Sequence, residues 1–234
     1  MTTTLLLIPG LGNTGRLFEH QIATFSPLMN VMVADHTQDD SMAGIARRAL
    51  ATAPERFSLA GLSMGGYAAM EIMRQAPERV ERLALLDTSA RPDTDEAKED
   101  RKRLIGLAES ERWDEILSGL WPKLVHPRRQ DDEALRKVVA DMLRETGAAG
   151  YVRQQRAIMA RPDSRDLLPG IEIPTLIVVG DGDSITPPEI AREMAEMVEW
   201  ASLIVVRGAG HLSSLEEPEQ VTAAMRLWLE KPQG

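Results

Sequence analysis

The sequence predicts an α/β fold, with a doubly wound, mostly parallel sheet of about six strands and helices on both faces. Short apolar runs recur along the chain, and segments with helical periodicity follow most of them. Residues 93–161 stand apart, since they contain no strand-like run and have the pattern of helices throughout.

The six expected strands are apolar nearly throughout, without the alternation of apolar and polar residues that marks a half-buried strand. Such runs are typical of parallel strands that are covered on both faces. They lie at residues 4–8, 31–34, 57–60, 83–86, 175–179 and 203–206.

The expected helices of the core follow these strands. They cover residues 63–75, about 187–197 and 217–230. The first places Met64, Ala68 and Ile72 on one face and ends before Pro77, while Pro187 and Pro188 open the second.

Residues 93–161 interrupt the alternation of strands and helices. Apolar residues recur at helical spacing from Trp113 to Trp121 and again from Leu135 to Leu143, and prolines and glycines separate these segments. We therefore expect a core of residues 1–92 and 162–234, and a lid of about four helices at residues 93–161 between the fourth and fifth strands.

The composition excludes several classes of function. The 234 residues carry 27 Lys+Arg and 36 Asp+Glu, a net charge of −9, so we expect no nucleic-acid or membrane partner. Without cysteine there is no thiolate nucleophile, and no ligand cluster suggests a metal or another cofactor. The start of the chain lacks the features of a signal peptide or a membrane span. We expect a cytoplasmic protein, and the choice between monomer and homodimer stays open.

The strongest local motif surrounds Ser63, in the stretch Gly-Leu-Ser-Met-Gly-Gly at residues 61–66. It follows an expected strand and precedes an expected helix. A serine on so sharp a turn crowds its neighbours, so glycine is needed on both sides. The turn exposes the hydroxyl and leaves the first N–H groups of the helix free to stabilise an anion.

A serine hydroxyl needs a general base to act as a nucleophile at neutral pH. The chain has four histidines, His20, His36, His126 and His211. His211 lies in a loop after the last expected strand, and such loops assemble the sites of parallel sheets. We therefore expect His211 to be the base, and surface or packing roles for the other three.

The carboxylate that orients this histidine has three candidates. Asp181 and Asp183 lie in the loop after the fifth expected strand, and Asp87 follows the fourth. The chain order Ser63, Asp183, His211 is the order of an α/β-hydrolase triad, but these residues alone leave the choice open.

These motifs resemble those of the α/β-hydrolase superfamily, in its lid-bearing esterase and meta-cleavage-product-hydrolase-like branch, over essentially the whole chain. Residues 9–12 are similar to the family's oxyanion loop and residues 61–66 to its nucleophile elbow. Residues 180–187 are similar to its acid loop and residues 208–211 to its histidine loop. The resemblance implies a catalytic triad of Ser63, Asp183 and His211, with Asp181 in a turn-capping role.

The chain departs from the family pattern in two places. Pro9 stands where the family usually has a histidine, which removes the support that this side chain gives to the oxyanion loop. The hole itself is built from backbone N–H groups, for which the resemblance implies Leu11 and Met64. The first two strands of the full family sheet are also missing, which leaves about six.

The implied triad predicts a serine hydrolase, most simply a carboxylesterase that cleaves a small neutral or apolar ester through an acyl-enzyme. Two alternatives stay open: a C–C bond hydrolase of meta-cleavage-type diketones, and a ligand receptor that retains the triad. A serine at the elbow disfavours the dehalogenases and epoxide hydrolases, which resemble this fold but use an aspartate there.

The lid is expected to select the substrate. Candidates for lining an apolar pocket are Trp121, Leu120, Leu143 and Met159, although such residues more often pack on the core. Arg153, Arg156 and Arg161 could meet a carboxylate, but the sequence favours a solvated helix face for them. Residues 91–166 hold 16 basic and 16 acidic residues, and this balance favours a neutral or apolar ester.

Overall fold

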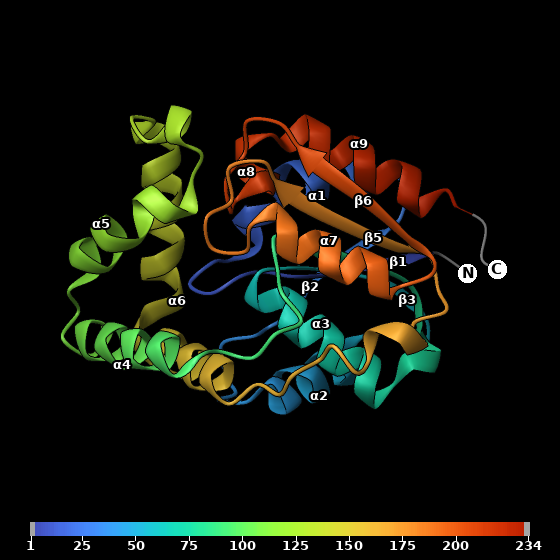
Figure 1. The fold of residues 1–234 in the computed structure, drawn as a ribbon, viewed down its shortest axis with the longest axis horizontal. Helices are drawn as coiled ribbons and strands as arrows, with labels where there is room; N and C mark the ends of the chain where they lie inside the picture. The colour runs from blue at the N-terminus through green and yellow to red at the C-terminus, as the bar shows by residue number, and fades with distance from the viewer. Residues whose placement is uncertain (1–2, 232–234) are drawn as a thin grey trace.

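The centre of the molecule is a six-stranded sheet, seen here in a computed structural model that describes residues 3–231 (Figure 1). The strand order is β2-β1-β3-β4-β5-β6, and every neighbouring pair is parallel. The strands are β1 (Thr4–Ile8), β2 (Asn30–Val33), β3 (Phe57–Leu62), β4 (Val80–Leu86), β5 (Thr175–Gly180) and β6 (Ala201–Val206). The predicted parallel sheet of about six strands is confirmed.

Two strands begin two or more residues earlier than the sequence predicted. β4 starts at Val80, because the half-buried Glu81 and Arg82 interrupt the apolar run without ending the strand. β6 starts at Ala201 and lies at an edge of the sheet, where most of its residues are only half-buried or exposed. The expectation of an apolar run applies to central strands and weakens at an edge.

Helices cover both faces of the sheet, because successive side chains of a strand point to opposite faces. Leu5 and Leu7 of β1 pack in one apolar layer, and Leu6 and Ile8 pack in the other. The first layer includes α1 (Glu19–Phe25), α8 (Ser213–Glu216) and α9 (Pro218–Leu229). The second includes α2 (Met42–Thr52), α3 (Met64–Gln75) and α7 (Pro188–Met197). Short 3-10 helices are η1 (Gly15–Phe18), η2 (Pro77–Arg79), η3 (Pro127–Arg129) and η4 (Leu168–Gly170).

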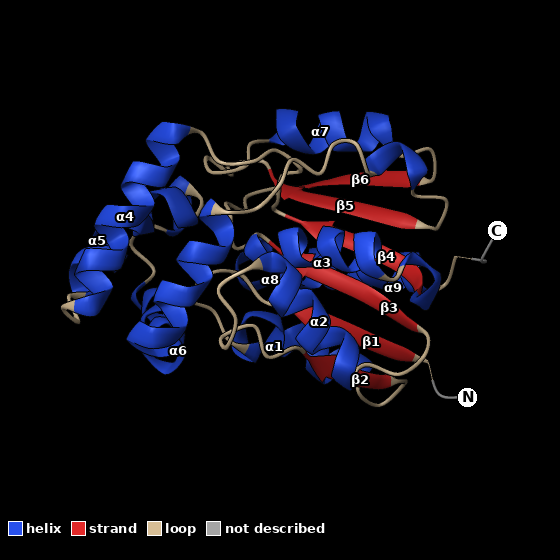
Figure 2. Cartoon of the chain, turned by 90° about the horizontal axis from the view of Figure 1, so that it is seen from below, coloured by secondary structure: helices blue, strands red, loops and turns tan. Residues whose placement is uncertain are grey.

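Between β4 and β5 the chain forms helices and no strand, and we call residues 93–161 the helical insert. It contains α4 (Asp95–Glu109), α5 (Trp113–Leu124) and α6 (Glu133–Met159), which bends at Gly147, where φ is 70°. Figures 1 and 2 show the insert standing beyond one end of the sheet, next to the carboxyl ends of the strands. Within residues 3–231, no helix is long and apolar enough to cross a membrane.

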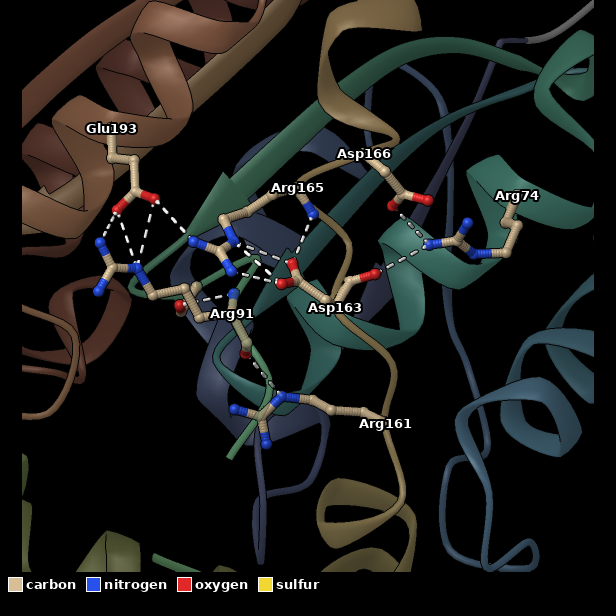
Figure 3. Close-up of polar contacts among 8 residues, drawn as sticks. Arg74, Arg91, Arg161, Asp163, Arg165, Asp166 and Glu193 are labelled. Atoms are coloured by element: carbon tan, nitrogen blue, oxygen red, sulfur yellow. Dashed lines mark hydrogen bonds and ion pairs between the residues drawn. The ribbon is translucent and has the colours of Figure 1, made fainter. Parts of the chain in front are cut away.

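The segment that leads from the insert back to β5 is held by ion pairs (Figure 3). Asp163 pairs with Arg165, and Arg74 of α3 donates to the Asp163 carbonyl and to Asp166. Arg91, which follows β4, pairs with Glu193 of α7. Both connections of the insert are therefore fastened to the helices on one face of the sheet.

Candidate active site

Ser63 lies on a strained turn between β3 and α3. Its φ of 56° and ψ of −116° are rare for a residue with a side chain. A Cβ on Gly61 would come closer than 3.0 Å to the backbone of Gly65, and one on Gly65 would come as close to the backbone of Ile8. These close approaches are the physical reason for glycine on both sides of Ser63, as the sequence predicted.

Ser63, His211 and Asp183 form a continuous chain of hydrogen bonds. His211 Nε2 lies 2.8 Å from Ser63 Oγ, and His211 Nδ1 lies 2.8 Å from Asp183 Oδ2. The three residues come from the loops after β3, β5 and β6, at the carboxyl ends of the strands. The structure thus brings together the three residues that the sequence analysis assigned to one triad, although Ser63 and His211 are 148 positions apart.

The carboxylate of Asp183 is buried and held by its own loop. Oδ1 accepts hydrogen bonds from the backbone N–H groups of Ile185 and Thr186, at 2.8 and 3.0 Å, and the Thr186 hydroxyl donates to Oδ2 at 2.8 Å. Burial alone would raise the pKa of Asp183, but His211 and these donors outweigh it and hold the pKa below its ordinary value. Asp183 therefore carries a negative charge at neutral pH.

His211 is almost completely buried beside this charge. Burial alone would lower the pKa of His211, but the Asp183 carboxylate outweighs burial and raises the pKa above its ordinary value of 6.5. A histidine that accepts a proton more readily, with Nε2 on a serine hydroxyl, has the arrangement of a general base.

Asp87 and Asp181, the other two acid candidates, do not bond to His211. Asp87 is fully buried, accepts from the Gly180 N–H at 2.9 Å and lies 2.5 Å from the Ser213 hydroxyl. Burial and the nearby Asp183 charge raise the pKa of Asp87 well above its ordinary value. Asp181 accepts from the Gly208 N–H at 2.8 Å, which ties two loops together.

The other three histidines lie apart from Ser63. His20 bonds to Thr222 at 2.8 Å, and His126 accepts from the Arg128 N–H at 3.2 Å. His36 is buried, and its Nε2 lies 3.2 Å from the Gly10 carbonyl. His36 therefore supports the loop that resembles the oxyanion loop.

The candidate oxyanion donors, Leu11 and Met64, flank this site. Met64 is the first residue of α3, so its N–H has no partner within the helix. Leu11 lines the same cavity as Ser63, and its N–H donates to no other residue within the described part of the chain.

Gln154 of α6 holds the loop of Leu11 from the side of the helical insert. Its side-chain oxygen accepts from the Gly12 N–H at 2.9 Å, and its amide nitrogen lies 3.5 Å from the His36 carbonyl. Together, Gln154 and His36 support the loop in which Pro9 replaces the usual histidine. The sequence did not indicate Gln154, because a glutamine between apolar helix positions carries no signal of such a partner.

A cavity of about 450 Å³ opens onto Ser63 and His211 and is bounded by the helical insert. Leu120 and Leu143 line it, as the sequence expected. Trp121 and Met159 do not. Trp121 is instead buried with its indole N–H donating to the Gln130 carbonyl, and Met159 is the last residue of α6. The sequence did not single out Tyr67, Arg101 and Tyr151, which also line the cavity.

The sequence favoured a solvated helix face for three arginines, but two of them bind other residues of the chain. Arg161 is 7% exposed, pairs with Asp93 at 2.7 Å and stacks over the Tyr67 ring at 4.1 Å. Arg153 donates to the Thr37 carbonyl at 2.7 Å, and only Arg156 is exposed. Helical periodicity shows that a residue lies outside the apolar face of its helix, but it does not show whether another loop covers that residue.

No group of three or more His, Asp or Glu placed to hold a metal occurs within residues 3–231.

The comparisons with known proteins agree with this geometry. The family model described as "Alpha/beta hydrolase family" matches residues 5–224. The chain belongs to the alpha/beta hydrolase family.

Esterases and other hydrolases are among the proteins that this chain resembles. The chain is 28% identical over 176 residues to a pimeloyl-(acyl-carrier protein) methyl ester esterase of Neisseria meningitidis serogroup B, covering 73% of this chain and 67% of that protein. It is 30% identical to the structure of a thermophilic esterase from Thermogutta terrifontis (malate bound), with a TM-score of 0.89 over 97% of this chain and 89% of that one. The enol-lactonase from Burkholderia xenovorans LB400, at 23% identity, shares the fold with a TM-score of 0.87 over 99% of this chain and 92% of that one. Family and relatives point to a hydrolase.

Proposed function

We propose that this protein is a serine carboxylesterase that cleaves a small ester through an acyl-enzyme on Ser63. The observation that carries the proposal is the hydrogen-bonded chain from Ser63 through His211 to Asp183 at the wall of a cavity. The esterases among the relatives support the same class of reaction.

In the proposed mechanism, Ser63 Oγ attacks the ester carbonyl carbon while His211 Nε2 takes the hydroxyl proton. The tetrahedral intermediate then breaks its bond to the alcohol oxygen, and His211 gives the proton to the departing alcohol. Water attacks the acyl-enzyme with the same help from His211 and releases the acid. Asp183 stays ionised throughout and stabilises the imidazolium.

The backbone N–H groups of Leu11 and Met64 are the proposed donors to the oxyanion. Their position supports this role, since one begins α3 and the other lies in a loop of the same cavity. Donors that are fixed before the reaction stabilise the developing charge without reorganising, and such stabilisation is often the largest contribution to catalysis.

The cavity supports a small substrate. About 450 Å³ lies within the range of small-molecule sites, and Leu120, Leu143 and Val139 provide apolar wall for the hydrocarbon part of an ester. The helical insert supplies these three residues, which supports its proposed role as a lid that selects the substrate.

An assay of short methyl esters tests the proposal. Hydrolysis is measured as the release of acid, which is titrated at constant pH. Ser63→Ala should abolish turnover and labelling by a fluorophosphonate probe. Ser184→Ala, at another serine that lines the cavity, should retain both. Turnover by Ser63→Ala equal to that of the unmodified protein would refute the mechanism. A vinylogous diketone assayed in parallel distinguishes ester hydrolysis from C–C bond hydrolysis.

A further inference from the structure

One wall of the cavity adjoins a buried cluster in which two cations share one anion. Asp93 pairs with Arg101 at 2.5 Å and with Arg161 at 2.7 Å. The exposed fractions of these side chains are 4% for Asp93, 7% for Arg161 and 19% for Arg101. An uncompensated charge at such a place is unfavourable, because little water solvates it.

The charge of this cluster follows from the ionisation of Asp93. Burial alone would raise the pKa of Asp93, but hydrogen bonds and charge from Arg101, together with the charge of Arg161, outweigh burial and hold the pKa below its ordinary value. Asp93 is therefore ionised at neutral pH, and both guanidiniums are charged. The cluster has a net charge of +1.

Arg101 is the member of the cluster that faces the cavity. A guanidinium has five N–H donors, and Arg101 uses two on Asp93 and one on Gln155. The other two have no acceptor within residues 3–231. Arg161, in contrast, lies over the Tyr67 ring. It also donates to the Arg91 carbonyl, as Figure 3 shows.

A second unused donor lies next to Arg101. The Gln155 side chain accepts from Arg101 at 3.0 Å and donates to the Tyr151 hydroxyl oxygen at 2.9 Å, so one amide joins the two residues. The Tyr151 hydroxyl itself donates to no residue in the described part of the chain. Burial raises the pKa of Tyr151 to about 12, so the hydroxyl keeps its proton.

We propose that Arg101 and Tyr151 bind a carboxylate of the substrate, which is then an ester or lactone that carries a free carboxylate elsewhere in the molecule. This inference rests on the proposed ester hydrolysis, because Ser63 and His211 line the same cavity. A carboxylate accepts hydrogen bonds from both donors, and its negative charge compensates the cluster.

The sequence favoured a neutral or apolar ester as substrate, whereas the proposed site requires a substrate that carries a negative charge. The balance of 16 basic and 16 acidic residues between 91 and 166 is a sum over the whole segment. Most of those acids, including Asp100 and Glu115 at the cavity, are exposed and screened by water, whereas the excess positive charge at Arg101 is largely buried beside the cavity. A balanced segment can therefore still bind an anion at short range.

Matched esters test the inference. Monomethyl adipate places the carboxylate on the acyl side and is compared with methyl hexanoate, while 6-acetoxyhexanoate places it on the alcohol side and is compared with hexyl acetate. We expect kcat/KM of one carboxylate ester to exceed that of its neutral counterpart by about tenfold or more. Which pair shows the preference identifies the side that carries the carboxylate.

Variants test which residues cause the preference for the carboxylate ester. Arg101→Gln and Tyr151→Phe should each remove most of the difference in kcat/KM between the carboxylate ester and its neutral counterpart. Arg161 still pairs with Asp93 in Arg101→Gln, and Tyr151→Phe keeps the ring that meets Trp113 edge-on. Lys102→Gln, which removes an exposed charge one residue away on α4, should preserve the preference.

Failure of this inference differs from failure of the proposed function. If neutral esters are hydrolysed but neither pair shows a preference, or if Arg101→Gln slows both members equally, the carboxylate site is wrong and the esterase stands. If no ester is hydrolysed, calorimetric binding of hexanoate against hexanamide decides. The site requires hexanoate to bind more tightly and Arg101→Gln to abolish the difference, and equal binding overturns it.

Discussion

The side-chain oxygen of Gln154 accepts a 2.9 Å hydrogen bond from the backbone N–H of Gly12, although 142 positions separate the two residues. Gln154 belongs to the helical insert, and Gly12 follows Leu11 in the loop proposed to stabilise the oxyanion. The insert therefore holds this loop in addition to forming a wall of the cavity.

Replacing Gln154 by leucine should lower kcat by about tenfold and change KM little. The Gly12 N–H loses its acceptor, so the neighbouring Leu11 N–H is held less precisely where the oxyanion forms. Steady-state kinetics on a methyl ester measure the effect. Gln75→Leu, at the end of α3, is the control and should match the unmodified protein. A rise in KM with constant kcat would show that Gln154 affects binding alone.

Activity should fall at acidic pH with a midpoint above 6.5. His211 acts as a base only when neutral, and its pKa is raised above that ordinary value by the Asp183 carboxylate in spite of burial. Asp183, with its lowered pKa, stays ionised over this range. A profile of kcat/KM against pH tests this, with circular dichroism to confirm that the protein stays folded. An acidic limb below pH 6.5 would contradict it.

Replacing either of the two buried aspartates, Asp183 and Asp87, by asparagine should have very different effects on kcat. Asp183→Asn should reduce kcat by about 10³–10⁴-fold, because the histidine loses the carboxylate that holds its tautomer and stabilises its charge. Asp87→Asn should retain activity within about tenfold. Asp87 does not bond to His211, and asparagine resembles the neutral acid that its raised pKa favours. Equal losses would mean that Asp87 shares the role.

A methyl group at Gly65 should destabilise the fold. Gly65→Ala places a Cβ against the Ile8 backbone, and we expect a loss of at least about 2 kcal/mol in the free energy of unfolding. Gly106→Ala, in α4, has open space around the new Cβ and should gain about 0.5–1 kcal/mol. Urea unfolding measures both. A Gly65→Ala protein as stable as the unmodified one would contradict the steric account.

Much of the fold was predictable because its signals are local. Apolar runs predicted all six strands, and the edge strand β6 and the polar start of β4 account for the earlier starts. Local motifs likewise singled out Ser63 and His211 and placed Asp183 among three candidate acids. The structure joins Ser63, His211 and Asp183 by hydrogen bonds. The choice of Asp183 over Asp87 and Asp181 needed the family resemblance, since all three follow strands.

The sequence by itself determined the parallel sheet, the glycine-flanked turn at Ser63 and the helical character of residues 93–161. These features follow from the spacing of neighbouring residues. Only the tertiary structure decided that Gln154 holds Gly12, that Trp121 packs away from the cavity and that Arg101 faces it with spare donors. Such contacts depend on how helices of the insert lie over loops far away in the sequence, and helical periodicity carries no information about the partner.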